Sequence, residues 1–234
     1  MIAKLPRWVW SAAWVLAFVA GMINVTGLLG FEKQAVTHLS GVTTLVGAAL
    51  GEGDLHALGH YLALLGSFVG GTVLSALIVR DSTLRLGRHY SVALGLEALL
   101  LVCAVPLLAA ERHAGLCLAA AACGLQNAMA STYSGSVVRT THVSGMFTDL
   151  GIFLGHHLQG IAVDGRRLRL CLIIISGFVA GATAGTLAFN RLGYAALYLP
   201  AAITGATSLV HALFWRRLAA LNPDDAPSAP RRPD

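Results

Sequence analysis

Charged residues are scarce in this sequence. Asp, Glu, Lys and Arg make up 12% of the 234 residues, whereas about 25% is usual in soluble domains, and the mean hydropathy is +0.71. Apolar runs recur along the whole length and leave no room for a sizeable soluble domain. The composition therefore excludes an ordinary soluble protein. It predicts one membrane domain over residues 1–221, with the lipid bilayer as its surroundings.

Motifs of catalysis and metal binding are also missing. The four cysteines lie in apolar runs without CxxC or CxxH spacing, so neither disulfides nor a zinc site is indicated. We find no GxSxG or HExxH motif, and we expect no cofactor, no metal and no enzymatic activity. The net charge of +5 comes from basic residues in loops and at the C-terminus, a pattern typical of orientation signals and not of nucleic-acid binding. The tail, residues 222–234, is rich in Pro and charge and is predicted to be disordered.

Six apolar runs are long enough to cross a bilayer, which takes about 20 helical residues. They cover residues 8–29, 58–79, 91–110, 114–133, 170–189 and 194–215. Two further segments, 37–50 and 141–158, are shorter or interrupted by His and Asp, which is typical of re-entrant or buried helices. The sequence predicts an all-α, polytopic membrane protein with about six full transmembrane helices and two short re-entrant or broken helices, and eight crossings are the alternative.

The positions of Lys and Arg favour six crossings. If the short segments enter the membrane and return, and the N-terminus is cytoplasmic, 13 of the 16 basic residues fall on the cytoplasmic side and only Lys33, Arg112 and Arg191 fall outside. If all eight segments cross, the distribution is 10 to 6. Because cytoplasmic loops carry the excess of basic residues, we expect six crossings with both termini in the cytoplasm.

The sequence repeats itself. "THLSG" at residues 37–41 recurs as "THVSG" at residues 141–145, and "THLSGVTTLVGAALG" and "THVSGMFTDLGIFLG" share 7 of 15 residues. "GMIN" at residues 21–24 matches "GLQN" at 124–127, and "FVGGTVLSAL" from Phe68 matches "FVAGATAGTL" from Phe178. We interpret residues 8–110 and 114–217 as two repeats. With three full spans each they would be inverted, as in many transporters, and with four they would be parallel.

Longer motifs point to a family. "GMINVTGLLGF" and "THLSGVTTLVGAALGEGD" in the first half, and "GLQNAMASTYSGSVVRTTHVSGMFTDLG" in the second, resemble the YoaK-like bacterial membrane proteins, a family of unknown function. The resemblance covers nearly the whole chain except the tail. It implies a multi-pass inner-membrane protein, sometimes described as a transporter, without an established substrate.

The repeated phrases supply the candidate site residues. Ser and Thr can cap a helix start, Gly allows close packing against a neighbouring helix, and two helix starts that meet near the membrane centre would favour an anion. An extended leg over residues 31–36 would carry the first phrase to that depth. The candidate substrate-binding residues are Asn24, His38, Ser40, Asn127, Arg139, Thr141, His142 and Ser144.

These residues also have simpler roles. Arg139 could be a cytoplasmic anchor, the two histidines could hold backbone by hydrogen bonds, and the two asparagines could join helices. Asp149 and His142 are the candidates for proton coupling, because ionisable groups at membrane depth mark pathways, and Glu97 is a second acidic candidate. Asp149 could instead be a structural partner of His142 or Arg139.

The leading hypothesis is a permease, with or without proton coupling, for a small polar or anionic solute or ion bound near the midplane between the repeats. The alternatives are a passive channel, a membrane-embedded enzyme with an unrecognised His and Asp site, or an assembly partner of another membrane protein. A homo-oligomer is compatible with the small-residue faces of the predicted helices.

Overall fold

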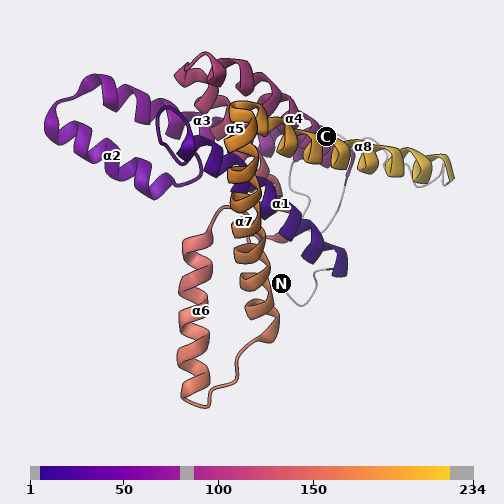
Figure 1. The fold of residues 1–234 in the computed structure, drawn as a ribbon. Coiled ribbons are helices and arrows are strands. Elements are labelled where there is room, and N and C mark those ends of the chain that lie inside the picture. The colour runs from indigo at the N-terminus through magenta and orange to yellow at the C-terminus, as the bar shows by residue number, and fades with distance from the viewer. Residues whose placement is uncertain (1–5, 80–86, 222–234) are drawn as a thin grey trace, which may run out of the picture.

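The computed structural model describes residues 6–79 and 87–221, and within these ranges every regular element is helical (Figure 1). The predicted all-α class is confirmed. The disordered tail expected at 222–234 lies outside the described residues. The elements are α1 (Arg7–Leu29), α2 (Leu39–Glu52), α3 (Leu55–Val79), α4 (Arg88–Ala109), α5 (His113–Ser134), α6 (Val143–Leu158), α7 (Gly165–Leu192), the 3₁₀ helix η2 (Gly193–Leu197) and α8 (Tyr198–Leu221).

Several of these helices are long and apolar enough to cross a membrane. In the described part of the chain, five stretches qualify: Trp8–Leu29, Leu55–Val79, His89–Ala109, His113–Ser134 and Gly165–Phe214. The last stretch contains α7, η2 and most of α8, because η2 joins the two α-helices without a loop. Gly193, at φ +56°, marks the change of direction there, a conformation that glycine adopts without steric cost. α2 and α6, with 14 and 16 residues, are not among these stretches.

Glycines bring α1 and α7 into close contact. A Cβ on Gly21 would overlap the backbone carbonyl of Phe178, so no larger residue fits without a shift. Three glycines of α7 face three equally spaced residues of α1 in the same order: Gly177 faces Trp14, Gly181 faces Phe18, and Gly185 faces Met22. Small residues of this kind let helix backbones approach closely in membranes. The matching order means that α1 and α7 run in the same direction.

α3 and α5 pack in the same way. A Cβ on Gly71 would overlap the carbonyl of Ala121, and a Cβ on Gly124 would overlap the carbonyl of Phe68. His60, near the start of α3, stacks on His113, the first residue of α5. These contacts place the start of α3 beside the start of α5, so these two helices also run in the same direction.

The two pairs run in opposite directions. Trp8, at the start of α1, contacts the ring of Tyr133, at the end of α5. A Cβ on Gly27, near the end of α1, would lie 3.4 Å from the side chain of Leu116, near the start of α5. α1 and α5 are therefore antiparallel, and so are the two helix pairs that contain them.

α4 lies against both α5 and α8. It is joined to α5 by a short turn, where a Cβ on Gly115 would lie 2.8 Å from the amide nitrogen of Leu108. On its other side the hydroxyl of Ser208 donates to the carbonyl of Ser91 at 2.6 Å, while Gly205 faces Ala98. Because Ser91 precedes Ala98 on α4 and Ser208 follows Gly205 on α8, these two helices are antiparallel.

The short helices form two hairpins that project from the body in different directions (Figure 1). Only Gly53 and Asp54 join α2 to α3, so α2 folds back along the first part of α3. The Asp54 carboxylate accepts hydrogen bonds from the NH groups of His56 and Ala57. Asp164 does the same at the start of α7, with the NH groups of Arg166 and Arg167. A carboxylate in this position satisfies NH groups that a helix start leaves unpaired.

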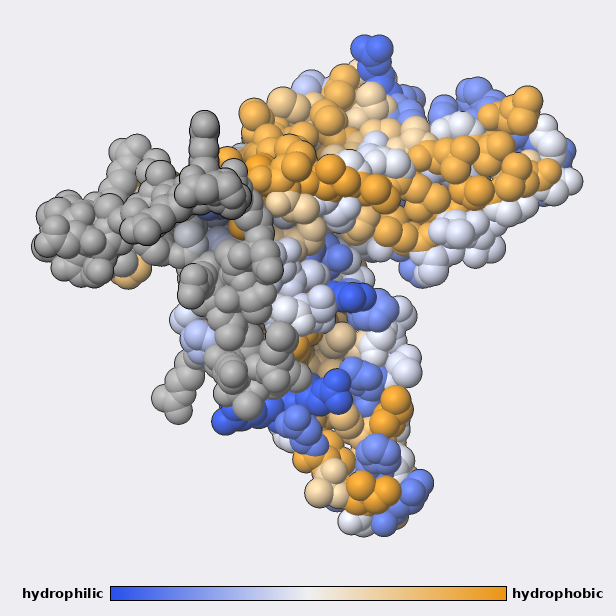
Figure 2. All heavy atoms as spheres, turned by 180° about the vertical axis from the view of Figure 1, so that it is seen from behind, coloured by the Kyte–Doolittle hydropathy of each residue, from blue (hydrophilic) through white to orange (hydrophobic). Residues whose placement is uncertain are grey.

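Both short helices are largely exposed. The buried residues of α2 are Val42 and Ala49, and that of α6 is Met146. Figure 2 shows a broad apolar surface over the α2–α3 hairpin, whereas apolar and hydrophilic residues alternate over the α6–α7 hairpin and hydrophilic residues gather where it meets the body. Apolar surface on this scale is unusual in soluble monomers and fits a lipid surrounding.

Candidate functional site

The repeated phrase begins both short helices, and histidine is the N-cap in each. His38 precedes α2 with φ −90° and ψ 64°, and His142 precedes α6 with φ −89° and ψ 55°. Neither cap makes a side-chain hydrogen bond. The expected capping by Ser or Thr is therefore wrong. The hydroxyl of Thr37 is used elsewhere, since it donates to Asn24.

The glycine of the phrase makes room for the histidine ring. A Cβ on Gly41 would overlap the ring of His38, and a Cβ on Gly145 would overlap the ring of His142. In both helices the imidazole thus lies over the backbone three residues ahead. The expectation that these glycines serve close packing against a neighbouring helix is wrong, because their open side is taken by the histidine of the same phrase.

The threonine of the first phrase is bound to α1. The side-chain oxygen of Asn24 accepts hydrogen bonds from the NH of Thr37 at 3.0 Å and from its hydroxyl at 2.8 Å. This fixes the start of α2 at the level of Asn24, about one and a half turns from the end of α1. The interpretation of Asn24 as a residue that joins segments thus has a specific contact behind it.

The second half departs from this arrangement. The side-chain oxygen of Asn127 is buried without a hydrogen-bond partner in the described residues. Its neighbour Gln126 is engaged instead, donating to the carbonyl of Leu16 at 3.1 Å and accepting from Thr140 at 3.4 Å. The two halves therefore hold equivalent segments by different hydrogen bonds.

Three predicted site residues meet in one cavity. Arg139, His142 and Asp149 line a cavity of about 240 Å³ together with Arg167, from the first turn of α7. Ser136, Val137, Met146, Leu170 and Cys171 complete its wall. The cavity is smaller than the 300–1,000 Å³ usual for drug-sized ligands. With two guanidinium groups and one carboxylate, its charge is +1 when the imidazole is neutral.

Other predicted residues lie elsewhere. His38, Ser40 and Ser144 are exposed, and Thr141 and the two asparagines are partly buried; none lines this cavity. α2 packs on α3 and α6 on α7.

The 31–36 segment is not an extended leg, since residues 31–32 and 36–37 form turns and Lys33 has φ +49°. A left-handed residue of this kind reverses the chain and shortens its reach.

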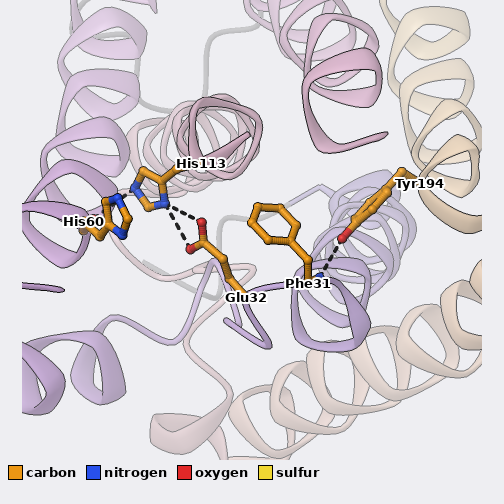
Figure 3. Close-up of polar contacts among 5 residues, drawn as sticks. All are labelled: Phe31, Glu32, His60, His113 and Tyr194. Carbon is orange, nitrogen blue, oxygen red and sulfur yellow. Dashed lines mark hydrogen bonds and ion pairs between the residues drawn. The ribbon is translucent and has the colours of Figure 1, made fainter. Parts of the chain in front are cut away.

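A second polar cluster lies at the other end of α5 (Figure 3). The Nδ1 of His113 lies 2.8 and 3.0 Å from the two carboxylate oxygens of Glu32, and its Nε2 lies 3.1 Å from the carbonyl oxygen of His60. A carbonyl oxygen only accepts, so Nε2 donates. Through its two ring nitrogens, His113 therefore joins the Glu32 carboxyl group to the backbone near the start of α3.

This cluster fastens the segment before α2 to three helices. The ring of His60 stacks on His113 at 4.4 Å. On the other side of the segment, the hydroxyl of Tyr194 in η2 accepts from the NH of Phe31 at 2.6 Å. The end of α1, the start of α3, the start of α5 and η2 thus meet at one end of the molecule.

Sequence reasoning missed both Arg167 and the Glu32–His113 pair. Arg167 was counted with the loop cations, because nothing in "GRRLR" tells which guanidinium faces a cavity. Glu32 and His113 are 81 residues apart, so no local spacing joins them. In the part of the chain that the structure describes, no group of three or more His, Cys, Asp or Glu side chains is arranged to hold a metal ion.

The fold and hydropathy thus define a helical protein with several helices able to span a membrane. The chain belongs to a family described as protein of unknown function DUF1275, whose model matches residues 12–210. This confirms the family resemblance drawn from the motifs. No curated protein and no solved structure is significantly similar to the chain.

Proposed function

We propose that this protein is an inner-membrane permease for a small anionic solute, with the Arg139–Arg167 cavity as one end of the path. The observation that carries the proposal is the cavity itself. Two arginines, one from the segment before α6 and one from α7, line it together with His142 and Asp149. Guanidinium groups bind carboxylates and oxyanions through paired hydrogen bonds, so a net positive cavity of this size fits a small anion.

The helix directions support six crossings. Because α1 and α3 are antiparallel and Glu32, His60 and His113 meet at one end, the end of α1 and the start of α3 lie at the same face. α2, which lies between them, leaves and returns to that face. α6 behaves in the same way. Ser136 and Val137, which follow α5, line one cavity with Arg167 at the start of α7, so the chain leaves and returns to one face there as well. With six crossings, the excess of basic residues favours a cytoplasmic location for both termini.

Equivalent contacts in the two halves support an inverted duplication. Gly21 meets Phe178 as Gly124 meets Phe68, and each of these glycines and phenylalanines was matched by the sequence repeat. Two further features occur once in each half. A carboxylate caps the helix after each short helix, Asp54 in the first half and Asp164 in the second. A histidine ring lies over Gly41 in the first half and over Gly145 in the second. Two repeats that enter the membrane from opposite faces are the architecture of many transporters.

The two ends of the molecule differ in a way that suits alternating access. At the outer end the segment before α2 is fastened by Glu32, Thr37 and Phe31. At the cytoplasmic end the equivalent segment borders an open cavity, and the side-chain oxygen of Asn127 accepts no hydrogen bond from the described residues. We interpret this structure as the inward-open form of the permease.

Uptake into proteoliposomes tests the proposal. The full chain is reconstituted, and entry of radiolabelled chloride, nitrate, sulfate, phosphate, acetate and succinate is measured against protein-free vesicles. For the anion that enters, Arg139→Gln and Arg167→Gln are each expected to lower uptake about tenfold, because a lost charge-assisted hydrogen bond costs about 1.5 kcal/mol or more.

Arg169→Gln is the matched control, since this exposed arginine lies two residues further along α7 and does not line the cavity. It should leave uptake unchanged. Entry of none of these anions, or equal loss in all three variants, contradicts the proposal. If the anion enters faster than a carrier can cycle, and its rate does not depend on an anion on the opposite side of the membrane, the protein is a channel instead.

A further inference from the structure

Glu97 is the most unusual buried group in the molecule. It lies near the middle of α4, is 0% exposed, and both of its carboxylate oxygens are buried without a hydrogen-bond partner. The ion pair found in the described residues is that of His113 with Glu32. Buried polar groups nearly always have partners, so this carboxyl calls for an explanation.

The described helices around α4 carry no permanent cation over their packed lengths. Lys and Arg are absent from residues 55–79, 89–109, 113–134 and 193–215, which cover α4 after its first residue and the elements that pack on it, namely α3, α5, η2 and most of α8. The titratable group that faces Glu97 from α5 is Cys123, which is also fully buried. The others on these elements have partners or lie nearer the helix ends: His211 bonds Ser91, Tyr90 contacts Tyr133, and Tyr194 bonds Phe31.

An ionised carboxylate does not fit this place. Moving a charge from water into an apolar interior without a partner costs several kcal/mol even after relaxation. Protonation removes the charge and most of that cost. The surroundings of Glu97 therefore fit the neutral carboxylic acid. The side chain is closed off from solvent, so the proton cannot pass to water while this packing holds.

Small residues line part of the contact between α4 and α8, where Gly95 faces Ser208 and Gly205 faces Ala98. Ala93, Leu101 and Ala104 are fully buried on α4. Asp149, in contrast, lies half-buried in an open cavity that two arginines also line.

We infer that Glu97 is a reversible proton-binding site at the centre of the α4–α5–α8 interface, and that its proton is the coupling ion of the permease. The second clause rests on the function proposed above. In each cycle the carboxylate takes one proton from water at one face and becomes the carboxylic acid, and it returns that proton to water at the other face. No other bond is made or broken. In the present structure Glu97 is buried away from both faces, which corresponds to the proton-bound step.

The first experiment detects the proton on Glu97 without any transport assay. Purified full-length protein in proteoliposomes is treated with dicyclohexylcarbodiimide, and adducts are located by mass spectrometry. A protonated carboxyl gives its proton to a carbodiimide nitrogen while its oxygen attacks the central carbon, and the O-acylisourea rearranges to a stable N-acylurea. We expect an adduct at Glu97 and none at Glu111, an exposed carboxylate at the α4–α5 turn.

Infrared difference spectra provide a second readout that needs no reagent access. The C=O stretch of a protonated carboxyl should be present in the parent protein and in Glu111→Gln, and lost in Glu97→Gln. The glutamine variant has the shape of the neutral acid, so it should fold. Absence of both the adduct and the infrared difference overturns the proton-binding site.

The third measurement links the proton to transport. With an anion that the parent takes up, an imposed pH gradient should accelerate entry, and Glu97→Gln should abolish that acceleration while it retains exchange of labelled for unlabelled anion. Unchanged acceleration in Glu97→Gln overturns the coupling role. If the parent moves none of the anions, the proposed permease fails, while the adduct and the infrared band still decide whether Glu97 binds a proton.

Discussion

The ring of His142 lies over the backbone of Gly145, and the ring of His38 lies over Gly41 in the same way. In each short helix a histidine begins the element and a glycine one turn later leaves space for its imidazole. The ring is therefore held against its own helix and not against a neighbour, and the phrase can be understood as one unit. The sequence "THxSG" recurs because the glycine and the histidine depend on one another.

Gly145→Ala should displace the histidine ring from its place over the glycine. The added methyl group would overlap the His142 ring, which must then leave its place beside the Arg139–Arg167 cavity. We expect a loss of about 1–3 kcal/mol in the free energy of unfolding, measured by thermal unfolding in detergent, together with weaker anion uptake.

Gly151→Ala is the matched control for that change. Gly151 lies on the same helix with no atom within 4 Å of a Cβ. Alanine is the better helix former by about 1 kcal/mol, so stability should stay equal or rise. Equal destabilisation by the two substitutions would contradict the role given to the histidine ring.

The contact between Thr37 and Asn24 can be measured by a double-mutant cycle. Thr37→Val removes the hydroxyl that donates to Asn24, at a cost of about 1 kcal/mol. Asn24→Ala leaves both the NH and the hydroxyl of Thr37 without their acceptor, and should cost about 1–3 kcal/mol. The two losses should not add, because the substitutions remove a shared interaction.

Thr141→Val is the matching change in the second half, where no side-chain hydrogen bond to Asn127 forms in the described structure. It should alter the free energy of unfolding by less than Thr37→Val. A larger effect at Thr141 would mean that the second half makes the Asn–Thr contact after all.

The Glu32–His113 contact should contribute measurably to stability. Glu32→Gln replaces one of the two carboxylate oxygens that lie 2.8 and 3.0 Å from the His113 ring, and it should destabilise the protein by about 1–2 kcal/mol. Glu52→Gln, which changes an exposed carboxylate at the end of α2, should leave the free energy of unfolding unchanged when both variants are unfolded thermally in detergent. Equal loss in the two variants would contradict the role given to the contact.

Sidedness labelling tests the number of crossings. Single cysteines are placed at Glu52, Glu111 and Gln159 in a background without the four native cysteines, and intact cells are treated with a membrane-impermeant reagent. Six crossings put Glu52 and Glu111 outside and Gln159 inside, whereas eight crossings put all three inside. Gln159 is thus the internal control, and protection of Glu52 and Glu111 would contradict the inverted repeats. Ser82, another informative position, lies outside the described residues.

The all-helical class could be predicted from the sequence because apolar runs and their interruptions are local properties. The two short helices begin within two residues of the predicted 37–50 and 141–158 segments. The role of Gly41 was misjudged, because a sequence does not tell which side chain fills the space above a glycine. Arg167 and the Glu32–His113 pair were missed because helix pairing between the halves joins residues that are distant in sequence.

Asp149 illustrates the same limit for the candidate site. Asp149 and His142, the two candidates for proton coupling, both line the cavity. The burial of Asp149 could not be read from spacing, and its half-exposed position makes it a less suitable proton carrier than Glu97. Depth depends on which helices surround a residue, and that is set by the tertiary fold.

The glycine contacts between α1 and α7, and between α3 and α5, have a consequence for synthesis in the cell. Each pair takes one helix from either half of the chain, so the first half leaves the ribosome with two grooves whose partners have not yet been translated. Neither half can complete its packing alone. Separately expressed halves should consequently be degraded when made singly and recover as a stable complex when made together.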